Sequence, residues 1–314
     1  MAMQGVENLA RMPELKRKLL WTFLLLAVYR VGIHVPVPGV DSLALADFFN
    51  SAKNTLFGMF DMFSGGGLNK LSIFTLGIMP YISASIVMQL LTVVSPELNR
   101  LQKEEGAQGR KKITQYTRYG TVLITLIQGL GIAVGLENMT SPTGAPLVLH
   151  PGLGFKFMTV MTLTAGTVFL MWLGEQITEK GIGNGISLII FSGIVAGLPR
   201  ALINTFSLVS QGEMSLLVLL LLMACMGAVI VAIVFMERGQ RRIPIQYAKR
   251  MVGRKMYGGQ TTHLPLRINT AGVIPPIFAS SILLFPATIA NFYQADWVQM
   301  VANWFSPSSI VYNV

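Results

Sequence analysis

The sequence predicts an all-α protein that crosses a membrane several times and has its N-terminus in the cytoplasm. Charged residues make up only 12% of the 314 residues, whereas a soluble domain carries about 25%. Hydrophobic side chains account for 52%, and the charges gather in a few segments between long apolar stretches. This composition excludes an ordinary soluble enzyme, a disordered chain and a fibrous protein.

Seven stretches are long enough to cross a bilayer as helices. Each has roughly 18 or more residues that are free or nearly free of Asp, Glu, Lys and Arg, the length a helix needs to span the hydrocarbon layer. In chain order they are 19–36, 71–96, 119–136, 157–174, 181–199, 214–236 and 268–295. The first contains Arg30 and His34 near its far end. Residues 309–314 resemble the start of an eighth helix, so we expect the chain to be incomplete.

The distribution of positive charge orients the predicted spans. With the N-terminus in the cytoplasm, 19 of the 24 Lys and Arg residues lie on the cytoplasmic side and four on the outer side. Loops rich in Lys and Arg stay in the cytoplasm, so this bias decides for the N-in orientation. A secretory signal is an alternative for the first stretch, because Lys16–Lys18 precede it. No small-residue cleavage site follows, and six further stretches do, which disfavours that alternative.

The spans contain no pattern typical of catalysis or metal binding. No Asp or Glu falls in the middle of a span; Glu175 and Glu179 lie at the cytoplasmic end of the fourth. His34, His150 and His263 are far apart in sequence, which disfavours a metal site built from them. Zinc-protease and nucleophile-elbow motifs are absent from the sequence. We therefore expect no enzymatic activity, no metal and no cofactor.

Isoleucine recurs at helical spacing in three of the spans. The members of each pair are three or four residues apart and so lie on one helix face. Composition alone favours lipid contact or helix packing for these faces. A flexible apolar constriction that resists ions and water is the second interpretation. The pairs are Ile82 and Ile86, Ile186 and Ile190, and Ile274 and Ile277.

Prolines and amides interrupt the apolar spans. Pro275 and Pro276 remove two backbone donors, which should bend the seventh helix. Gln89, Gln128 and Asn269 lie within spans or at the start of one, where amides usually hydrogen-bond across helices for about 1 kcal/mol each. Contacts this weak suit helices that must sometimes separate.

The segment at about 56–67 is strongly apolar but too short to cross a membrane, and it ends in three glycines. One interpretation is an interfacial helix that lies flat on the outer leaflet. The other is a re-entrant helix, which is tolerated at membrane depth only where protein surrounds it.

Five sequence blocks resemble the SecY family, the channel-forming subunits of the bacterial protein translocon. They are Pro36–Val40, Leu76–Ser85, Gly181–Ser187, Gln240–Pro244 with Tyr247–Arg250, and Thr262–Asn269 with Ala271–Pro275. The blocks follow the family's order, and the resemblance covers essentially the whole chain. It implies an inverted-repeat helical bundle of ten spans in the bacterial inner membrane, in which two halves close around a pore. Residues 1–205 match the first half, spans one to five; residues 206–314 match an incomplete second half with spans six and seven and the start of span eight.

The resemblance also implies roles for individual residues. A hydrophobic pore ring is implied at Ile82, Ile86, Ile186, Ile190 and Ile277. A plug is implied at about 56–67, with Phe57, Met59, Phe60, Met62, Phe63, Gly65, Gly66 and Gly67. A lateral gate is implied at Gln89, Gln128 and Asn269. A docking loop is implied at about 237–267, with Arg241, Arg242, Lys249, Arg250, Arg254 and Lys255.

The function that the resemblance implies is passage of unfolded secretory polypeptides through the pore and release of transmembrane segments sideways into lipid. The implied partners are SecE and SecG subunits, a signal peptide substrate, membrane lipid, and either the SecA motor or a ribosome whose RNA meets the cytoplasmic loops. The driving force would come from SecA ATP hydrolysis or from the ribosome. The alternative is an inverted-repeat secondary transporter of a small solute, which the missing midplane carboxylate disfavours.

Overall fold

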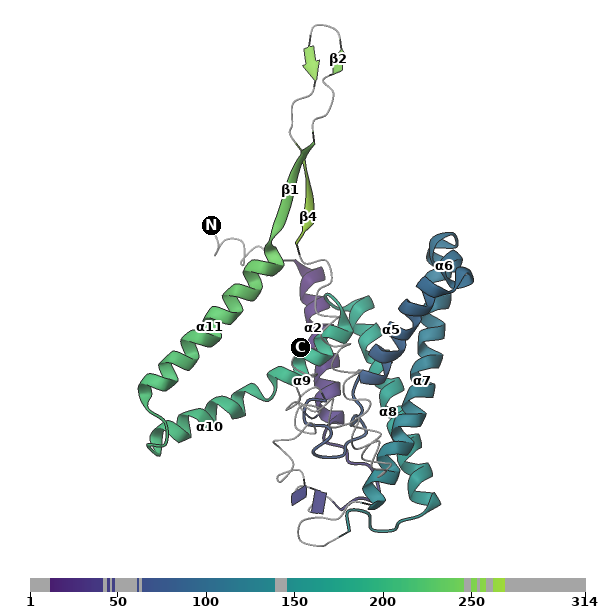
Figure 1. Cartoon of the computed structure of the whole chain (residues 1–314), viewed down its shortest axis with the longest axis vertical. Coiled ribbons are helices and arrows are strands. Elements are labelled where there is room, and N and C mark those ends of the chain that lie inside the picture. The colour runs from purple at the N-terminus through teal and green to yellow at the C-terminus, as the bar shows by residue number, and fades with distance from the viewer. Residues whose placement is uncertain are drawn as a thin grey trace. The chain divides into compact units, whose positions relative to one another are not determined.

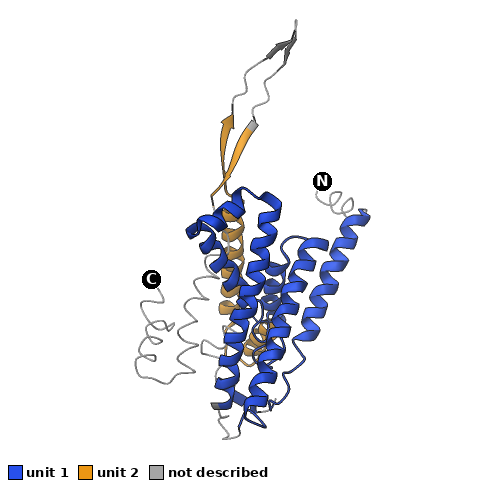
Figure 2. Cartoon of the chain, turned by 90° about the vertical axis from the view of Figure 1, so that its right-hand side faces the viewer, with its two compact units in different colours: residues 1–199, 278–314 blue, residues 200–277 orange. Residues whose placement is uncertain are grey.

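The computed structural model describes residues 12–41, 44–45, 47–48, 61, 64–138, 146–245, 250–252, 255–257 and 262–268 (Figure 1). The chain divides into two compact units, coloured separately in Figure 2. The first unit comprises residues 1–199 with 278–314, and the second comprises residues 200–277.

Helices make up most of the described part of the first unit. Its helices are α2 (Pro13–Gly32), α5 (Met79–Val94), α6 (Pro96–Lys103), α7 (Gly106–Asn138), α8 (Leu153–Lys180) and α9 (Gly185–Val195). Helix α7 packs along both α5 and α8, and α8 also packs against α2 and α9. Helix α8 is therefore the helix around which this unit is organised.

Local sequence explains where these helices begin. A proline in the first turn opens α2, α5 and α6, because its fixed φ suits a helix and its missing N–H costs nothing there. Helix α9 instead begins with a side-chain cap: Oδ1 of Asn184 accepts hydrogen bonds from the backbone N–H groups of Ile186 at 3.1 Å and Ser187 at 3.5 Å.

Four helical segments in the described ranges are long and apolar enough to cross a membrane: Gly106–Glu137, Leu153–Lys180, Gly185–Ser210 and Leu216–Arg238. The pair α5 and α6 raises this to five if it counts as one span, although the two helices are bent by 100°. The predicted seventh stretch, 268–295, lies almost entirely outside the described residues, as does 309–314. The total of seven spans and the cytoplasmic N-terminus stay predictions.

The predicted start of the second span was wrong. The apolar stretch begins at Leu71, but residues 71–78 form turns and α5 begins only at Met79. Leu71 has φ 40° and Gly77 has φ 55°, left-handed conformations that a helix of L-residues cannot continue through. The backbone N–H of Ser72 donates to the carbonyl of Gly67 at 2.9 Å, which ties the turns to the preceding glycines. Residues 71–78 are therefore apolar because they form a buried loop, and not because they belong to a membrane-spanning helix.

Two apolar clusters form the core of the first unit. The loop cluster joins the residues around these turns to α7 and α8, and contains Val37, Leu45, Leu68, Leu71, Leu76, Ala133, Leu136, Leu147, Val148, Phe155 and Leu163. The helix cluster joins α2, α8 and α9, and contains Leu25, Tyr29, Ile33, Phe74, Ile78, Leu170, Leu173, Ile177 and Ile189. The ring of Phe74 stacks against Tyr29 and Phe169, each with 6.0 Å between centroids.

The second unit contains helices and a β-ribbon. Helix α10 (Leu198–Ser210) begins at the boundary between the units, and α11 (Leu216–Arg238) follows with an almost entirely exposed, apolar surface. Strands β1 (Gln240–Ile245) and β4 (Thr262–Arg267) pair antiparallel, from Gln240 opposite Arg267 to Ile245 opposite Thr262. Strands β2 (Arg250–Val252) and β3 (Lys255–Tyr257) form a second antiparallel pair. The region predicted as the loop 237–267 is thus largely a β-ribbon (Figure 1).

Candidate pore and docking sites

The predicted pore-ring residues of the first unit come from α5 and α9. Ile82 of α5 and Ile186 and Ile190 of α9 are half-buried, and all three pack against the helix cluster. Ile86 is buried in the same unit, with 6% of its surface exposed. The structure thus brings three of these isoleucines to one apolar cluster. Ile277 lies outside the described residues.

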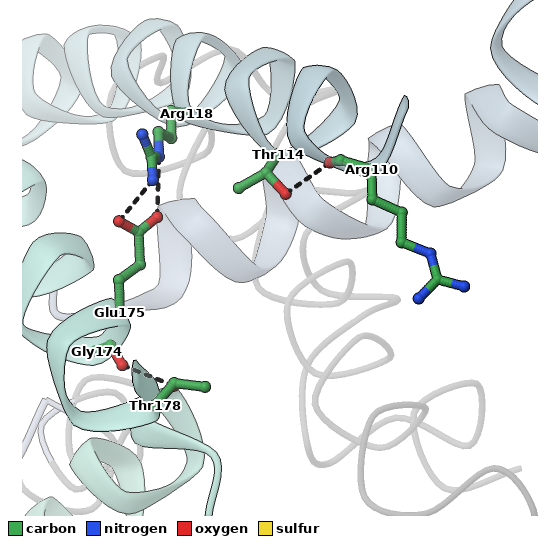
Figure 3. Close-up of polar contacts among 6 residues, drawn as sticks. All are labelled: Arg110, Thr114, Arg118, Gly174, Glu175 and Thr178. Carbon is green, nitrogen blue, oxygen red and sulfur yellow. Dashed lines mark hydrogen bonds and ion pairs between the residues drawn. The ribbon is translucent and has the colours of Figure 1, made fainter. Parts of the chain in front are cut away.

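A tight turn between α8 and α9 sets the position of the two α9 isoleucines. An added Cβ at Gly185 would lie 2.0 Å from the carbonyl oxygen of Gly174, so only glycine fits at this crossing. The hydroxyl of Thr178 accepts a hydrogen bond from the backbone N–H of Gly185 at 2.8 Å. The same hydroxyl donates to the carbonyl of Gly174 at 2.8 Å (Figure 3). Helix α9 therefore begins at a fixed place on α8.

Helix α2 also contacts the turn between α8 and α9. The hydroxyl of Thr22 accepts a hydrogen bond from the backbone N–H of Ile182 at 3.2 Å and donates to the carbonyl of Lys18 at 2.9 Å. The ammonium of Lys180 lies 5.7 Å from the ring centroid of Trp21, a cation–π contact between α8 and α2. These polar contacts fix the turn from which α9 starts.

A bidentate ion pair joins α7 to α8 (Figure 3). Nε of Arg118 donates to Oε1 of Glu175 at 2.9 Å, and Nη2 donates to Oε2 at 2.8 Å. Their side chains are 48% and 26% exposed, so solvent screens the pair and its contribution to stability is about 1 kcal/mol or less. This pair was not predicted from the sequence. Opposite charges at the ends of two neighbouring spans, on the same predicted side, were the available signal.

The predicted gate amides have different surroundings. Gln89 is exposed on α5, whereas Gln128 is half-buried on α7. The Oε1 atom of Gln128 is buried and has no hydrogen-bond partner in the part of the chain that the structure describes. Asn269 lies outside that part. The lateral gate stays a prediction.

Three of the predicted plug residues, Gly65, Gly66 and Gly67, belong to a well-bonded loop. Gly65 and Gly66 have φ of 69° and 89°, conformations that favour glycine. Phe57, Met59, Phe60, Met62 and Phe63 lie outside the described residues.

Asp61 closes this loop by accepting backbone hydrogen bonds. Its Oδ1 accepts from the N–H of Asn69 at 2.8 Å, and its carbonyl accepts from the N–H of Gly66 at 2.9 Å. Burial raises the pKa of the Asp61 carboxyl above its ordinary value, while the backbone donors of Asn69 and Leu68 and the charge of Lys70 act in the opposite direction.

The predicted docking residues lie in and between the strands of the β-ribbon. Arg241 and Arg242 are exposed on β1. Arg250 lies in β2 and Lys255 in β3, and Lys249 and Arg254 lie outside the described residues.

Comparisons with known proteins agree with the resemblance. The SecY family model matches residues 72–314. Protein translocase subunit SecY of Escherichia coli (strain K12) is 54% identical over 303 residues, which cover 95% of this chain and 68% of that protein. Its counterpart in Aquifex aeolicus (strain VF5) is 50% identical over 308 residues, which cover 98% of this chain and 72% of that protein.

Two solved structures share the fold. A protein-conducting channel has a TM-score of 0.61 at 18% identity, and Sec61 from the canine ribosome-channel complex of the endoplasmic reticulum has a TM-score of 0.60 at 17% identity. Each comparison covers 92% of this chain and 60% of the other, so the chain spans less than two thirds of the solved channels. Taken with the apolar helices, these matches show that the chain belongs to the SecY family of protein translocase subunits, multi-pass proteins of the bacterial inner membrane.

Proposed function

We propose that this chain forms the pore-lining part of a channel that conducts unfolded secretory polypeptides across the membrane. The observation that carries the proposal is the convergence of Ile82, Ile186 and Ile190, from α5 and α9, on one apolar cluster in a chain of this family. Ile86 and Ile277 complete the proposed ring.

The chemistry of these side chains suits the task. Branched aliphatic groups form a flexible constriction that resists water and ions but makes no hydrogen bonds to a passing polypeptide. They therefore impose no sequence preference on the substrate. A signal helix that is more favourable in the open state than in the closed state would shift the channel toward opening.

A small-solute transporter is disfavoured by the placement of carboxylates. Ion-coupled carriers use intramembrane Asp or Glu residues. In the named helices, carboxylates lie within about two turns of a helix end, as Glu137 does on α7, Glu175 and Glu179 on α8 and Glu237 on α11. Family membership weighs against the same alternative.

The partners follow from the same proposal. SecE and SecG subunits complete the channel, and SecA or a translating ribosome supplies the driving force, so no catalytic activity is assigned to this chain. Arg241 and Arg242 offer exposed guanidinium groups to ribosomal RNA phosphates or to the motor. Gln89, Gln128 and Asn269 form the lateral gate, where transmembrane segments leave for the lipid.

Protein translocation into sealed vesicles tests the proposal. The native complex is reconstituted in proteoliposomes with SecA, ATP and a radiolabelled precursor, and external protease is then added. We expect a fraction of the precursor to be protected, and to become digestible after detergent lysis. Complete digestion in sealed vesicles that contain folded complex would overturn the proposal; vesicles without the complex are the control.

A further inference from the structure

The first predicted span contains a charged residue among apolar ones. Arg30 is the only Lys or Arg in the apolar stretch 19–36, and a charge there is costly unless it finds partners. Its Nη1 atom donates a hydrogen bond to the carbonyl of Gly65 at 3.1 Å. The neighbouring Tyr29, only 1% exposed, donates from its hydroxyl to the carbonyl of Ser64 at 3.2 Å. Two consecutive residues of α2 thus hold two consecutive carbonyls.

The segment that they hold, Ser64–Gly67, which we call the glycine loop, lies directly against α9. An added Cβ at Gly65 would lie 2.9 Å from the Cα of Gly193, and one at Gly193 would lie 3.3 Å from the Cα of Gly65. The two backbones therefore touch without side chains between them. Gly193 follows Ile190 by three residues, so this contact lies within one helical turn of a proposed ring residue.

Hydrogen bonds also tie the glycine loop to the residues before and after it. The backbone N–H of Leu68 donates to the hydroxyl of Ser64 at 3.1 Å, and that hydroxyl donates to the carbonyl of Asp61 at 3.1 Å. Tyr29 is fixed in turn, because its ring stacks on Phe74. The contacts therefore run without a gap from Arg30 and Tyr29, through the carbonyls of Gly65 and Ser64, to the backbone of α9 at Gly193.

We propose that Tyr29 and Arg30 are positioning residues for the pore: through the glycine loop they clamp α9 so that Ile190 stays in the closed constriction. The inference rests on the proposed function, because the position of α9 matters only if Ile190 lines a pore. It adds residues of the first span to those that keep the resting channel sealed. The guanidinium carries the larger part of the clamp, because a hydrogen bond from a charged donor is stronger than one from a neutral hydroxyl.

The experiment measures resting ion conductance of the native complex in planar bilayers. For Arg30→Gln we expect a rise of roughly tenfold over wild type, the change in the open-to-closed ratio that loss of one charge-assisted hydrogen bond produces. Arg30→Lys keeps a charged donor and should recover most of the seal. Tyr29→Phe keeps the stacked ring and should leak less than Arg30→Gln. Gly193→Ala acts from the other side of the contact and should also leak.

Arg100→Gln is the matched control, because Arg100 of α6 pairs with Glu104, just after the end of that helix, and its side chain is 76% exposed. Equal leak from this control, or wild-type conductance in folded Arg30→Gln and Gly193→Ala channels, would overturn the inference. Wild-type complex from the same preparation is assayed for precursor translocation. If it does not translocate, the proposed function fails; if it translocates while the variants stay sealed, the clamp alone fails.

Discussion

At the scale of single residues, the close crossing of α8 and α9 requires a glycine, which has no side chain. Gly185 lies against the carbonyl of Gly174 with no room for a methyl group. The ring isoleucines Ile186 and Ile190 follow immediately along α9, so this contact sets their height on α8. A methyl group added at Gly185 would therefore disturb both the helix packing and the position of the ring isoleucines.

Gly185→Ala should destabilise the protein by about 1–3 kcal/mol, because the added methyl overpacks a backbone contact that cannot yield cheaply. The measurement is the unfolding midpoint of the purified complex in detergent. Gly154→Ala is the matched control, since Gly154 is on α8 and no atom lies within 4 Å of the place that its added methyl would take. The control should be neutral or stabilising by up to about 1 kcal/mol. Equal losses for the two variants would contradict this account of the crossing.

Ile190→Asn, alone and with Ile86→Asn, should increase resting ion conductance and allow export of a precursor with a defective signal sequence. An amide in the constriction attracts water, so the closed state loses its barrier to ions. Planar-bilayer recordings and an export assay measure the two effects. Unchanged conductance in the folded double variant would show that these residues do not line the constriction.

At the scale of elements, we expect the loop between α2 and α5 to respond to pH through Asp61. Burial raises the pKa of this carboxyl above 3.8, so the folded loop favours the protonated form. That stabilisation is present below the ordinary pKa and is lost as the pH rises through the raised value. Exchange of the backbone amides of Gly66 and Asn69, corrected for intrinsic rates, should show declining protection across this window. Asp61→Asn should abolish the pH dependence, and a wild-type slope in that variant would contradict the assignment.

Elements that are determined by neighbouring residues in the chain could be predicted from the sequence, and elements that depend on tertiary packing could not. Helices α7 and α8 follow from long apolar runs, and the proline and asparagine starts are readable from single residues. The left-handed turns at Leu71 and Gly77 could not be predicted, because the apolar pattern there serves a buried loop. The β-ribbon was predicted only as a loop. Its strands contain Pro244 and Pro265, which a two-stranded ribbon tolerates since both strands are edges.

The candidate site was predictable only in part, because some of its contacts follow from local sequence and others from tertiary packing. Helical spacing and the family resemblance together selected Ile82, Ile186 and Ile190, which the structure brings to one cluster. The contacts that position α9 and join α7 to α8 depend on residues far apart in the chain, such as Thr22 with Ile182 and Arg118 with Glu175. The packing of the helices selects such partners; opposite charges at the same predicted side hint at Arg118 with Glu175, whereas no sequence pattern points to Thr22 with Ile182.

At the scale of the whole molecule, the net charge of +10 is a property of one predicted face. If the β-ribbon meets ribosomal RNA, Arg242→Glu should weaken ribosome binding and reduce its salt dependence by about one phosphate contact. Cosedimentation of the complex with ribosomes over a series of salt concentrations measures both. Arg200→Glu, an equal charge change at an exposed residue on the predicted outer side, is the control. The same loss in both variants would indicate a general charge effect.

The most direct test of the central claim places a photocrosslinker at Ile86 or Ile190 of the native channel and engages it with a ribosome carrying a stalled secretory chain. Met161, 52% exposed on α8, is the control position. We expect adducts with the nascent chain at Ile86 and Ile190 and none at Met161, because only the proposed ring surrounds the passing polypeptide. No adduct at either isoleucine, with ribosomes bound, would contradict the claim that this chain lines a protein-conducting pore.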